Sequence, residues 1–158
     1  MRKLVLFAIS VLSFAFLSCN PESGDFNAET IIGLERAALD RWGRGDPQGF
    51  FDLSAPDQTY FDPTGEKRVD GREAIRALIL PFTGKIKIKR YDMINPSVQR
   101  DGNIAVLTFN LIDHETQVDG VNKGSVRWNA TEVYRKVDGD WKIIHSHWSY
   151  TRPELKQP

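Results

Sequence analysis

Residues 128–149 read WNATEVYRKVDGDWKIIHSHWS, two runs of alternating polar and apolar side chains joined by an Asp-Gly pair at 138–139. Such alternation is typical of strands with one buried face, and Asp-Gly between two strands predicts a hairpin with a two-residue loop. This loop pairs Val137 with Asp140, and counting back along the ladder places Glu132 opposite His145. Directly opposed residues share a face, so the sequence predicts one surface made of Trp128, Ala130, Glu132, Tyr134, Ile143, His145 and His147.

The other face of the first strand is largely polar, so we expect this surface to line the interior of the domain. The polar face consists of Arg127, Asn129, Thr131, Val133 and Arg135. An apolar interior with a few polar groups is the usual composition of a small-molecule site. The alternative is a packed core that tolerates Glu132 because His145 pairs with it.

The chain before residue 85 has a helical pattern, and helices are predicted over 28–43, 46–54 and 70–81. From residue 85 onward the pattern has period two. Helices followed by an antiparallel meander indicate an α+β domain, a cone-shaped curved antiparallel sheet with about three N-terminal helices packed on its concave face. We expect Glu35 on the solvent-facing side of the first helix, opposite the apolar positions Ile31, Leu34, Ala38, Leu39 and Trp42.

The N-terminus, MRKLVLFAISVLSFAFLSCN, has two basic residues, an apolar run over 4–17 and a small residue before Cys19. This pattern predicts a secretory signal peptide, and the run is short for a membrane-spanning helix. FLSC resembles the lipobox of bacterial lipoproteins, which implies a lipid on Cys19; a plain signal peptide is the alternative. We expect a signal peptide at 1–18, a tether at 19–27, a domain at 28–152 and a tail at 153–158. The protein would be anchored in the cell envelope, facing the periplasm or the cell exterior.

The charge balance is even, with 21 basic and 21 acidic residues, which gives no basic footprint for nucleic acid. Hydrophobic residues make up 41 % of the chain, as in an ordinary globular protein. Cys19 is the only cysteine, so we expect no internal disulfide.

The short stretch TYFDP at 59–63 ends a predicted strand with a carboxylate, Asp62, held in front of Pro63. Asp62 could cap a turn, or it could be the polar group of a buried pocket. The sequence favours neither reading over the other.

The order of several motifs resembles the nuclear transport factor 2-like superfamily. The motifs are WGRGD at 42–46, TYFDP at 59–63, DGREAIRAL at 70–78, INP at 94–96 and the closing hairpin. Within the superfamily, residues 28–149 resemble the SnoaL-like proteins and the association domain of calcium/calmodulin-dependent protein kinase II. The resemblance implies a cone with helices closing its wide end, an internal pocket, and a homodimer formed through the outer sheet face.

The ketosteroid isomerases of this superfamily suggest roles for the polar residues. Their catalytic base is the Asp of an Asp-Pro pair, which matches Asp62, and the protonated acid of their oxyanion hole falls at Glu132. The resemblance implies Asp62 as general base with Glu132 or His145 as acid. The tyrosine that these enzymes carry on the first helix falls at Ala38, so a steroid isomerase of the familiar form is not predicted. Tyr60 and Tyr134 are the candidates to replace it. The predicted ligand contacts are Tyr60, Trp128, Tyr134 and His147.

Two further comparisons limit the ligand. An arginine that helps the kinase association domain to bind small carboxylates falls at Glu132, which argues against an anionic ligand held in that way. His145 and His147 lie two apart on one strand and could bind a metal together with Glu132 or Asp62. We rank that arrangement last and predict neither a metal nor a cofactor.

Three functions remain open from the sequence. The favoured one is binding of a small, largely apolar molecule without chemical change. The second is an isomerase or cyclase that uses Asp62 and either Glu132 or His145. The third is a homo-oligomerisation module, and a shared fold alone cannot choose among the three.

Overall fold

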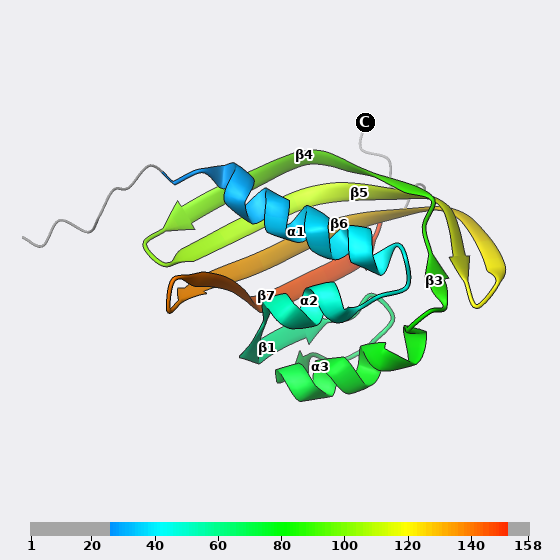
Figure 1. Cartoon of the computed structure of the whole chain (residues 1–158), viewed down its shortest axis with the longest axis horizontal. Helices are drawn as coiled ribbons and strands as arrows, with labels where there is room; N and C mark the ends of the chain where they lie inside the picture. Colours follow the sequence, from blue (N-terminus) through cyan, green and yellow to red (C-terminus); the bar gives the residue numbers. More distant parts are fainter. Residues whose placement is uncertain (1–25, 152–158) are drawn as a thin grey trace, which may run out of the picture.

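A strongly curved sheet of seven strands carries three helices on its inner side (Figure 1). The computed structural model describes residues 26–151. The predicted signal peptide, Cys19 and the tail lie outside these residues. The elements are α1 (Ala28–Trp42), α2 (Gln48–Leu53), β1 (Ser54–Phe61), β2 (Val69–Asp70), α3 (Arg72–Ile79), η1 (Leu80–Phe82), β3 (Ile86–Lys87), β4 (Arg90–Asp101), β5 (Ile104–Val118), β6 (Val121–Val137) and β7 (Asp140–Tyr150).

The strand order is β2-β1-β7-β6-β5-β3, and β4 also pairs with β5. The long strands β4 to β7 form an antiparallel meander, and the predicted α+β class with a curved sheet and inner helices is confirmed. One pairing differs from the prediction, because β1 runs parallel to β7. That pairing places Tyr60 beside Ser146 and so brings the TYFDP stretch to the closing hairpin.

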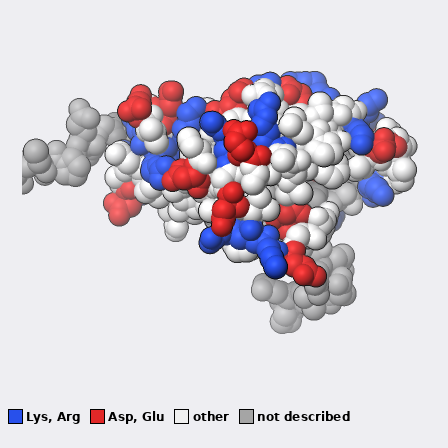
Figure 2. Space-filling view, turned by 90° about the horizontal axis from the view of Figure 1, so that it is seen from below, with Lys and Arg blue, Asp and Glu red and all other residues white. Residues whose placement is uncertain are grey.

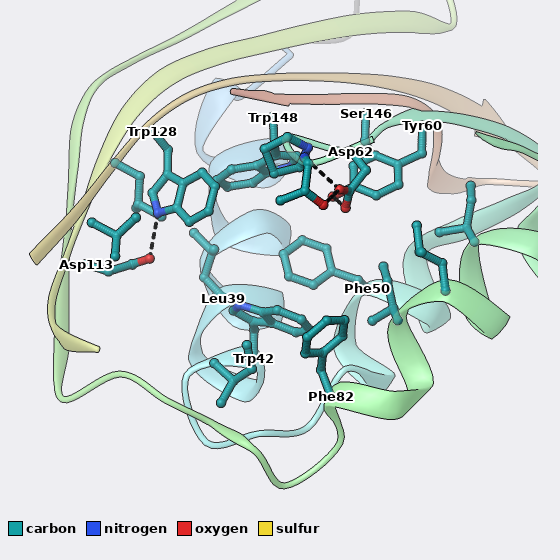
Figure 3. Close-up of a pocket in the computed structure, with 18 of the residues that line it drawn as sticks. Leu39, Trp42, Phe50, Tyr60, Asp62, Phe82, Asp113, Trp128, Ser146 and Trp148 are labelled. Carbon is teal, nitrogen blue, oxygen red and sulfur yellow. Dashed lines mark hydrogen bonds between the residues drawn. The ribbon is translucent and has the colours of Figure 1, made fainter. Parts of the chain in front are cut away.

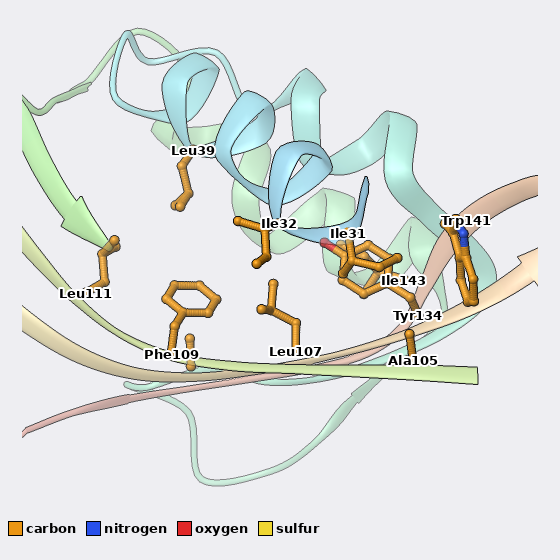
Figure 4. Close-up of a cluster of buried hydrophobic side chains, with 11 residues drawn as sticks. Ile31, Ile32, Leu39, Ala105, Leu107, Phe109, Leu111, Tyr134, Trp141 and Ile143 are labelled. Atoms are coloured by element: carbon orange, nitrogen blue, oxygen red, sulfur yellow. The ribbon is translucent and has the colours of Figure 1, made fainter. Parts of the chain in front are cut away.

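The core lies between α1 and the inner face of β5 (Figure 4). Ile31, Ile32 and Leu39 of α1 point towards alternating side chains of β5, namely Leu107, Phe109 and Leu111. Full burial of each such side chain contributes about 1.5–3 kcal/mol to the stability of the fold. This packing fixes which face of α1 is turned towards the sheet.

The expectation that Glu35 faces solvent is wrong, because its side chain is 0 % exposed. Position 35 comes one helical turn after Ile31 and one turn before Leu39, so the period of the helix directs it into the apolar face. The prediction placed Glu35 in solvent because its side chain is acidic, and did not use its position in the helical period.

The hairpin between β6 and β7 begins as predicted. Asp138 and Gly139 have φ values of 50° and 94°, as a two-residue loop of this kind requires, and Val137 pairs with Asp140. The predicted pairing of Tyr134 with Ile143 is also confirmed.

The predicted register fails one residue later, because Ile144 is an extra residue in β7. Val133 pairs with His145, and Glu132 therefore lies opposite Ser146 instead of His145. A β-bulge of one residue exchanges the two faces of the strand beyond it. The interior face continues with Ser146 and Trp148, while His145 and His147 turn to the outside.

The segment after η1 is tied to the end of α1 by a close approach of two glycines. Gly84 N–H donates a 2.8 Å hydrogen bond to the carbonyl of Gly45, and Ile88 N–H donates one of 2.9 Å to the carbonyl of Gly43. A Cβ atom on Gly45 would lie 2.9 Å from the Cα of Gly84, and Gly45 has a φ of +82°. Only glycine satisfies both conditions at position 45.

Acidic and basic side chains are intermixed on the face seen in Figure 2, and neither sign gathers over one element. That face has no basic stripe of the kind that binds nucleic acid. Among residues 26–151, none of the helices combines the length and the apolar character that crossing a bilayer demands.

Candidate functional site

A cavity of about 590 Å³ lies between the helices and the inner face of the sheet (Figure 3). Its size falls within the range usual for small-molecule sites. Its walls are mainly apolar and aromatic, and they include Leu39, Trp42, Phe50, Phe82, Trp128 and Trp148. The charged side chains in the lining are Asp62, Asp113, Lys123 and Glu132.

Glu132 on β6 is 0 % exposed, and both of its carboxyl oxygens are hydrogen-bonded. Trp148 donates from Nε1 to Oε1 over 2.7 Å, and the Ser146 hydroxyl lies 2.5 Å from Oε2. Burial, and then the charge of Glu35, raise the pKa of Glu132 well above its usual range. This environment favours the protonated acid.

A chain of buried polar groups leads from β1 to Glu132. Ser54 donates to the amide oxygen of Gln58, and Gln58 Nε2 donates to the Ser146 hydroxyl over 2.9 Å. When Glu132 is protonated, its own proton can bond to Ser146, and the Ser146 hydroxyl proton is then free to point into the cavity. The network thus couples the protonation of a buried acid to a donor on the cavity wall.

Tyr134, a predicted ligand contact, lies in the core and not on the cavity wall. Its hydroxyl donates a 2.6 Å hydrogen bond to Oε2 of Glu35. Burial raises the pKa of Glu35 to about 7, although the bond from Tyr134 acts in the opposite direction. Glu35 is a second buried acid, next to Glu132, that the sequence prediction missed. Its position on the apolar face of α1 was the feature that could have predicted its burial.

Asp62 has both of the roles that the sequence left open. Its Oδ1 accepts from the backbone N–H of Thr64 over 2.8 Å and from the Thr64 hydroxyl over 2.5 Å, so it caps the turn after β1. Its Oδ2 accepts from the Tyr60 hydroxyl over 3.2 Å, and both Asp62 and Tyr60 line the cavity. Burial, followed by the charge of Asp62, raises the pKa of Tyr60, which therefore stays a neutral donor.

His145 and His147 lie on the opposite side of the sheet from Glu132. The Thr59 hydroxyl lies 2.8 Å from Nδ1 of His145, and the Phe61 ring lies 5.8 Å and 5.4 Å from the two imidazoles. Partial burial and the neighbouring His147 lower the pKa of His145. The bulge at Ile144 separates both imidazoles from the cavity, so the predicted grouping of Glu132 with His145 is wrong.

Metal ligation by these histidines has no geometric support. Within residues 26–151, no three His, Cys, Asp or Glu side chains lie close enough together to hold a metal ion.

Trp128 lines the cavity as predicted, stacked on Tyr150 with ring centroids 4.4 Å apart. Its Nε1 donates a 2.8 Å hydrogen bond to Asp113, a carboxylate that the sequence analysis did not single out. Asp113 continues the inward alternation of Phe109 and Leu111 along β5, and that period was the signal that could have found it.

Comparison with known proteins identifies the fold. Residues 36–153 match the family model of the SnoaL-like domain. A protein of Parabacteroides distasonis, described as a candidate ketosteroid isomerase, is 40 % identical with a TM-score of 0.68, over 82 % of this chain and 92 % of that one. No curated protein matches the sequence.

Association domains of calcium/calmodulin-dependent protein kinase II share the fold. A candidate domain of this type from Xanthomonas campestris is 26 % identical with a TM-score of 0.65, over 84 % of this chain and 93 % of that one. The hub homology domain from Chlamydomonas reinhardtii is 22 % identical with a TM-score of 0.65, over 79 % and 98 %. The predicted resemblance to the nuclear transport factor 2-like superfamily is confirmed.

Proposed function

The chain belongs to the SnoaL-like domain family, and we propose that it binds a small, largely apolar molecule in the cavity between Asp62, Glu132 and Asp113. The observation that supports this most directly is the cavity itself, about 590 Å³ of space with mainly aromatic and aliphatic walls. With Glu132 held as a neutral acid, the carboxyl groups of Asp62 and Asp113 stand against a single lysine in the lining, which disfavours an anionic ligand.

Binding can be tested with Nile red, a neutral dye whose fluorescence rises in apolar surroundings. Ile79 lines the cavity, so Ile79→Trp should fill part of it and weaken dye binding by about tenfold or more. Leu80 is the next residue, is 43 % exposed and lies outside the lining, so Leu80→Trp is a control of equal size. The proposal fails if the dye does not saturate the wild type, or if the two variants bind it equally.

A second candidate function is proton transfer at carbon, and the pairing of Asp62 with a protonated Glu132 network favours it. Asp62 would take a proton from the carbon next to a carbonyl group. The Ser146 hydroxyl, backed by Glu132, would then hydrogen-bond the enolate oxygen. NMR of 2-tetralone in D₂O can measure this exchange. Asp62→Asn should abolish any rate above buffer, and a wild type no faster than buffer rules the activity out for this ketone.

We also propose that the protein is anchored in the cell envelope by a lipid on Cys19. The support is the sequence pattern of residues 1–19. Mass spectrometry of the N-terminal peptide should find acyl groups, and Cys19→Ser should move the protein from the membrane pellet to the supernatant. A variant that still pellets with membranes would contradict the anchor.

Finally, we propose a homodimer formed through the outer face of the sheet. The support is the fold shared with the hub domains. Sedimentation velocity on the purified chain tests it, and a single monomeric species up to high protein concentration would exclude it.

A further inference from the structure

One end of the cavity, away from the Glu132 network, is built around Asp113 of β5. Asp113 is 4 % exposed and lines the cavity together with Thr116 and Trp128. Figure 3 shows it beneath Trp128, whose indole N–H is bonded to it. A carboxyl group in this place is costly to bury, and burial raises the pKa of Asp113 to about 6.

A second bulge brings Asp113 and Thr116 to the same side of the sheet. Asp113 pairs with Val126 and Thr116 pairs with Gly124, so two residues of β5 oppose one of β6. Glu115, inside this bulge, has a φ of +52°. In a regular strand, side chains three apart point to opposite faces, and the bulge therefore turns Thr116 into the cavity.

Both side chains keep an unused hydrogen-bonding atom. Within residues 26–151, Oδ1 of Asp113 and Oγ1 of Thr116 are buried and have no hydrogen-bond partner. A buried polar atom without a partner costs about 1–3 kcal/mol, so such atoms call for a partner from outside the chain. The bond from Trp128 occupies one oxygen of Asp113 and leaves the other without a partner.

The charge at this end restricts what that partner can be. Asp113 offers only acceptor oxygens when ionised, whereas Thr116 can accept or donate. Lys123 is the single basic side chain of the cavity lining, and no salt bridge joins it to Asp113 in the described part of the chain. A carboxylate-ended ligand would meet a like charge here, whereas a hydroxyl or an ammonium group would satisfy Asp113.

We propose that Asp113 and Thr116 form a second polar subsite, which accepts a hydrogen-bond donor at one end of the apolar ligand. This inference rests on the proposed binding function. The ligand class is an apolar body that ends in a hydroxyl or an ammonium group, with that end next to Trp128. The Glu132 network then faces another part of the same molecule.

The test is displacement of Nile red from the full chain at pH 7.5 by three probes with one shared body: biphenyl, biphenyl-4-methanamine and biphenyl-4-carboxylate. Wild type should bind the amine about tenfold or more tightly than biphenyl, as expected for a hydrogen bond to a charged group. The carboxylate should bind more weakly than biphenyl.

Asp113→Asn should change this order. The asparagine oxygen can still accept from Trp128, and its amide then presents N–H donors to the cavity. The preference for the amine over biphenyl should disappear, and the carboxylate should gain affinity. Asp119→Asn removes the same charge at the tip of the same hairpin, outside the lining, and should retain the wild-type order.

The outcomes separate the two proposals. If Nile red does not bind the wild type, the binding function and the subsite both fall. If it binds but the amine gains nothing over biphenyl, or Asp113→Asn keeps the wild-type order, the subsite alone is wrong. Should circular dichroism show Asp113→Asn unfolded, Thr116→Val decides instead: it should reduce the amine preference severalfold, and an unchanged preference overturns the subsite.

Discussion

The hydroxyl of Tyr134 on β6 donates a 2.6 Å hydrogen bond to the carboxyl group of Glu35 on α1, and both side chains are fully buried. This bond fixes the first helix on the sheet at a point where the rest of the contact is apolar. Burial, and then the charge of Glu35, raise the pKa of Glu132, which is the centre of the hydrogen-bond network of the cavity. The helix and the site are therefore linked through two acids.

The stability of the fold should fall as pH rises through the range in which Glu35 ionises. Its pKa rises from 4.5 to about 7 on folding, so the folded chain binds more protons between these values. The stabilisation is complete below about pH 4.5 and is lost as pH passes 7. Urea unfolding should show roughly 2–3 kcal/mol less stability at pH 8 than at pH 5 from this group.

Glu35→Gln should reduce that dependence, because glutamine cannot ionise and still accepts the bond from Tyr134; the part that remains comes from the other buried acids, Glu132 and Asp113. Glu29→Gln alters an acid on the exposed side of the same helix and should keep the wild-type dependence. Equal slopes in wild type and Glu35→Gln would show that Glu35 is not the group responsible.

Trp148→Phe should destabilise the fold by about 1–3 kcal/mol beyond the loss of ring area, because it removes the donor to Oε1 of Glu132. The same change should raise the pKa of Glu132 further, since the bond from Trp148 lowers it. NMR titration of the Glu132 carboxyl carbon measures this shift. Trp42→Phe removes an indole from another wall of the cavity and should leave the titration of Glu132 in place.

Deletion of Ile144 should be tolerated, because Ile144 is the unpaired residue of the bulge. Without it, Val133 would still pair with His145 and Glu132 with Ser146, so the buried acid would keep its partners. We expect cooperative thermal unfolding and a loss of about 1–3 kcal/mol, from the half-buried side chain and the altered twist of the strand. His145→Ala removes a partly buried side chain with a bond to Thr59 and should cost about 1 kcal/mol. If Ile144 were instead a regular member of the ladder, its deletion would shift Ser146 away from Glu132, so loss of cooperative unfolding would contradict the assigned bulge.

Two glycines in the helical layer should respond to alanine in opposite directions. A Cβ on Gly33 of α1 would meet nothing within 4 Å, so Gly33→Ala should stabilise the fold by roughly 0.5–1 kcal/mol. A Cβ on Gly49 of α2 would lie 2.9 Å from the Cα of Ala38, so Gly49→Ala should push α2 away from α1 and destabilise it. Thermal denaturation of both variants gives the two signs, and a shift in the same direction would refute the close packing of α1 and α2.

The helices, the meander and the start of the closing hairpin could be predicted, because period and turn chemistry are local signals. Asp138-Gly139 fixed the first pairs of β6 and β7 correctly. The bulge could not be predicted, since Ile143 and Ile144 are both apolar and either could face inward. Beyond these two isoleucines, the inward or outward direction of each β7 side chain depends on which of the two is the extra residue, and the sequence does not show that.

The candidate site was predicted in part for the same reason. Glu132, Asp62, Tyr60 and Trp128 were predicted as site residues, and all four line the cavity. His145 and His147 face away from it because the register differs from the predicted one. Glu35 was missed because its carboxyl group was assigned to the surface by type, and Asp113 received no assignment. Their buried positions follow from the period of α1 and of β5. The burial of each acid is explained only by its hydrogen-bond partner, Tyr134 for Glu35 and Trp128 for Asp113.

The glycine contact between the end of α1 and the segment after η1 bears on how a guest molecule would reach the interior. Two backbone hydrogen bonds hold the two segments together there, and position 45 has no room for a side chain, so this contact should resist opening. By contrast, α3 buries only Ile75, and Leu78 of α3 and Phe82 of η1 remain about two-fifths exposed. A ligand should therefore enter and leave the cavity on the α3 side. Substitutions in this short helix should change the rates of ligand association and dissociation more than substitutions in the sheet do.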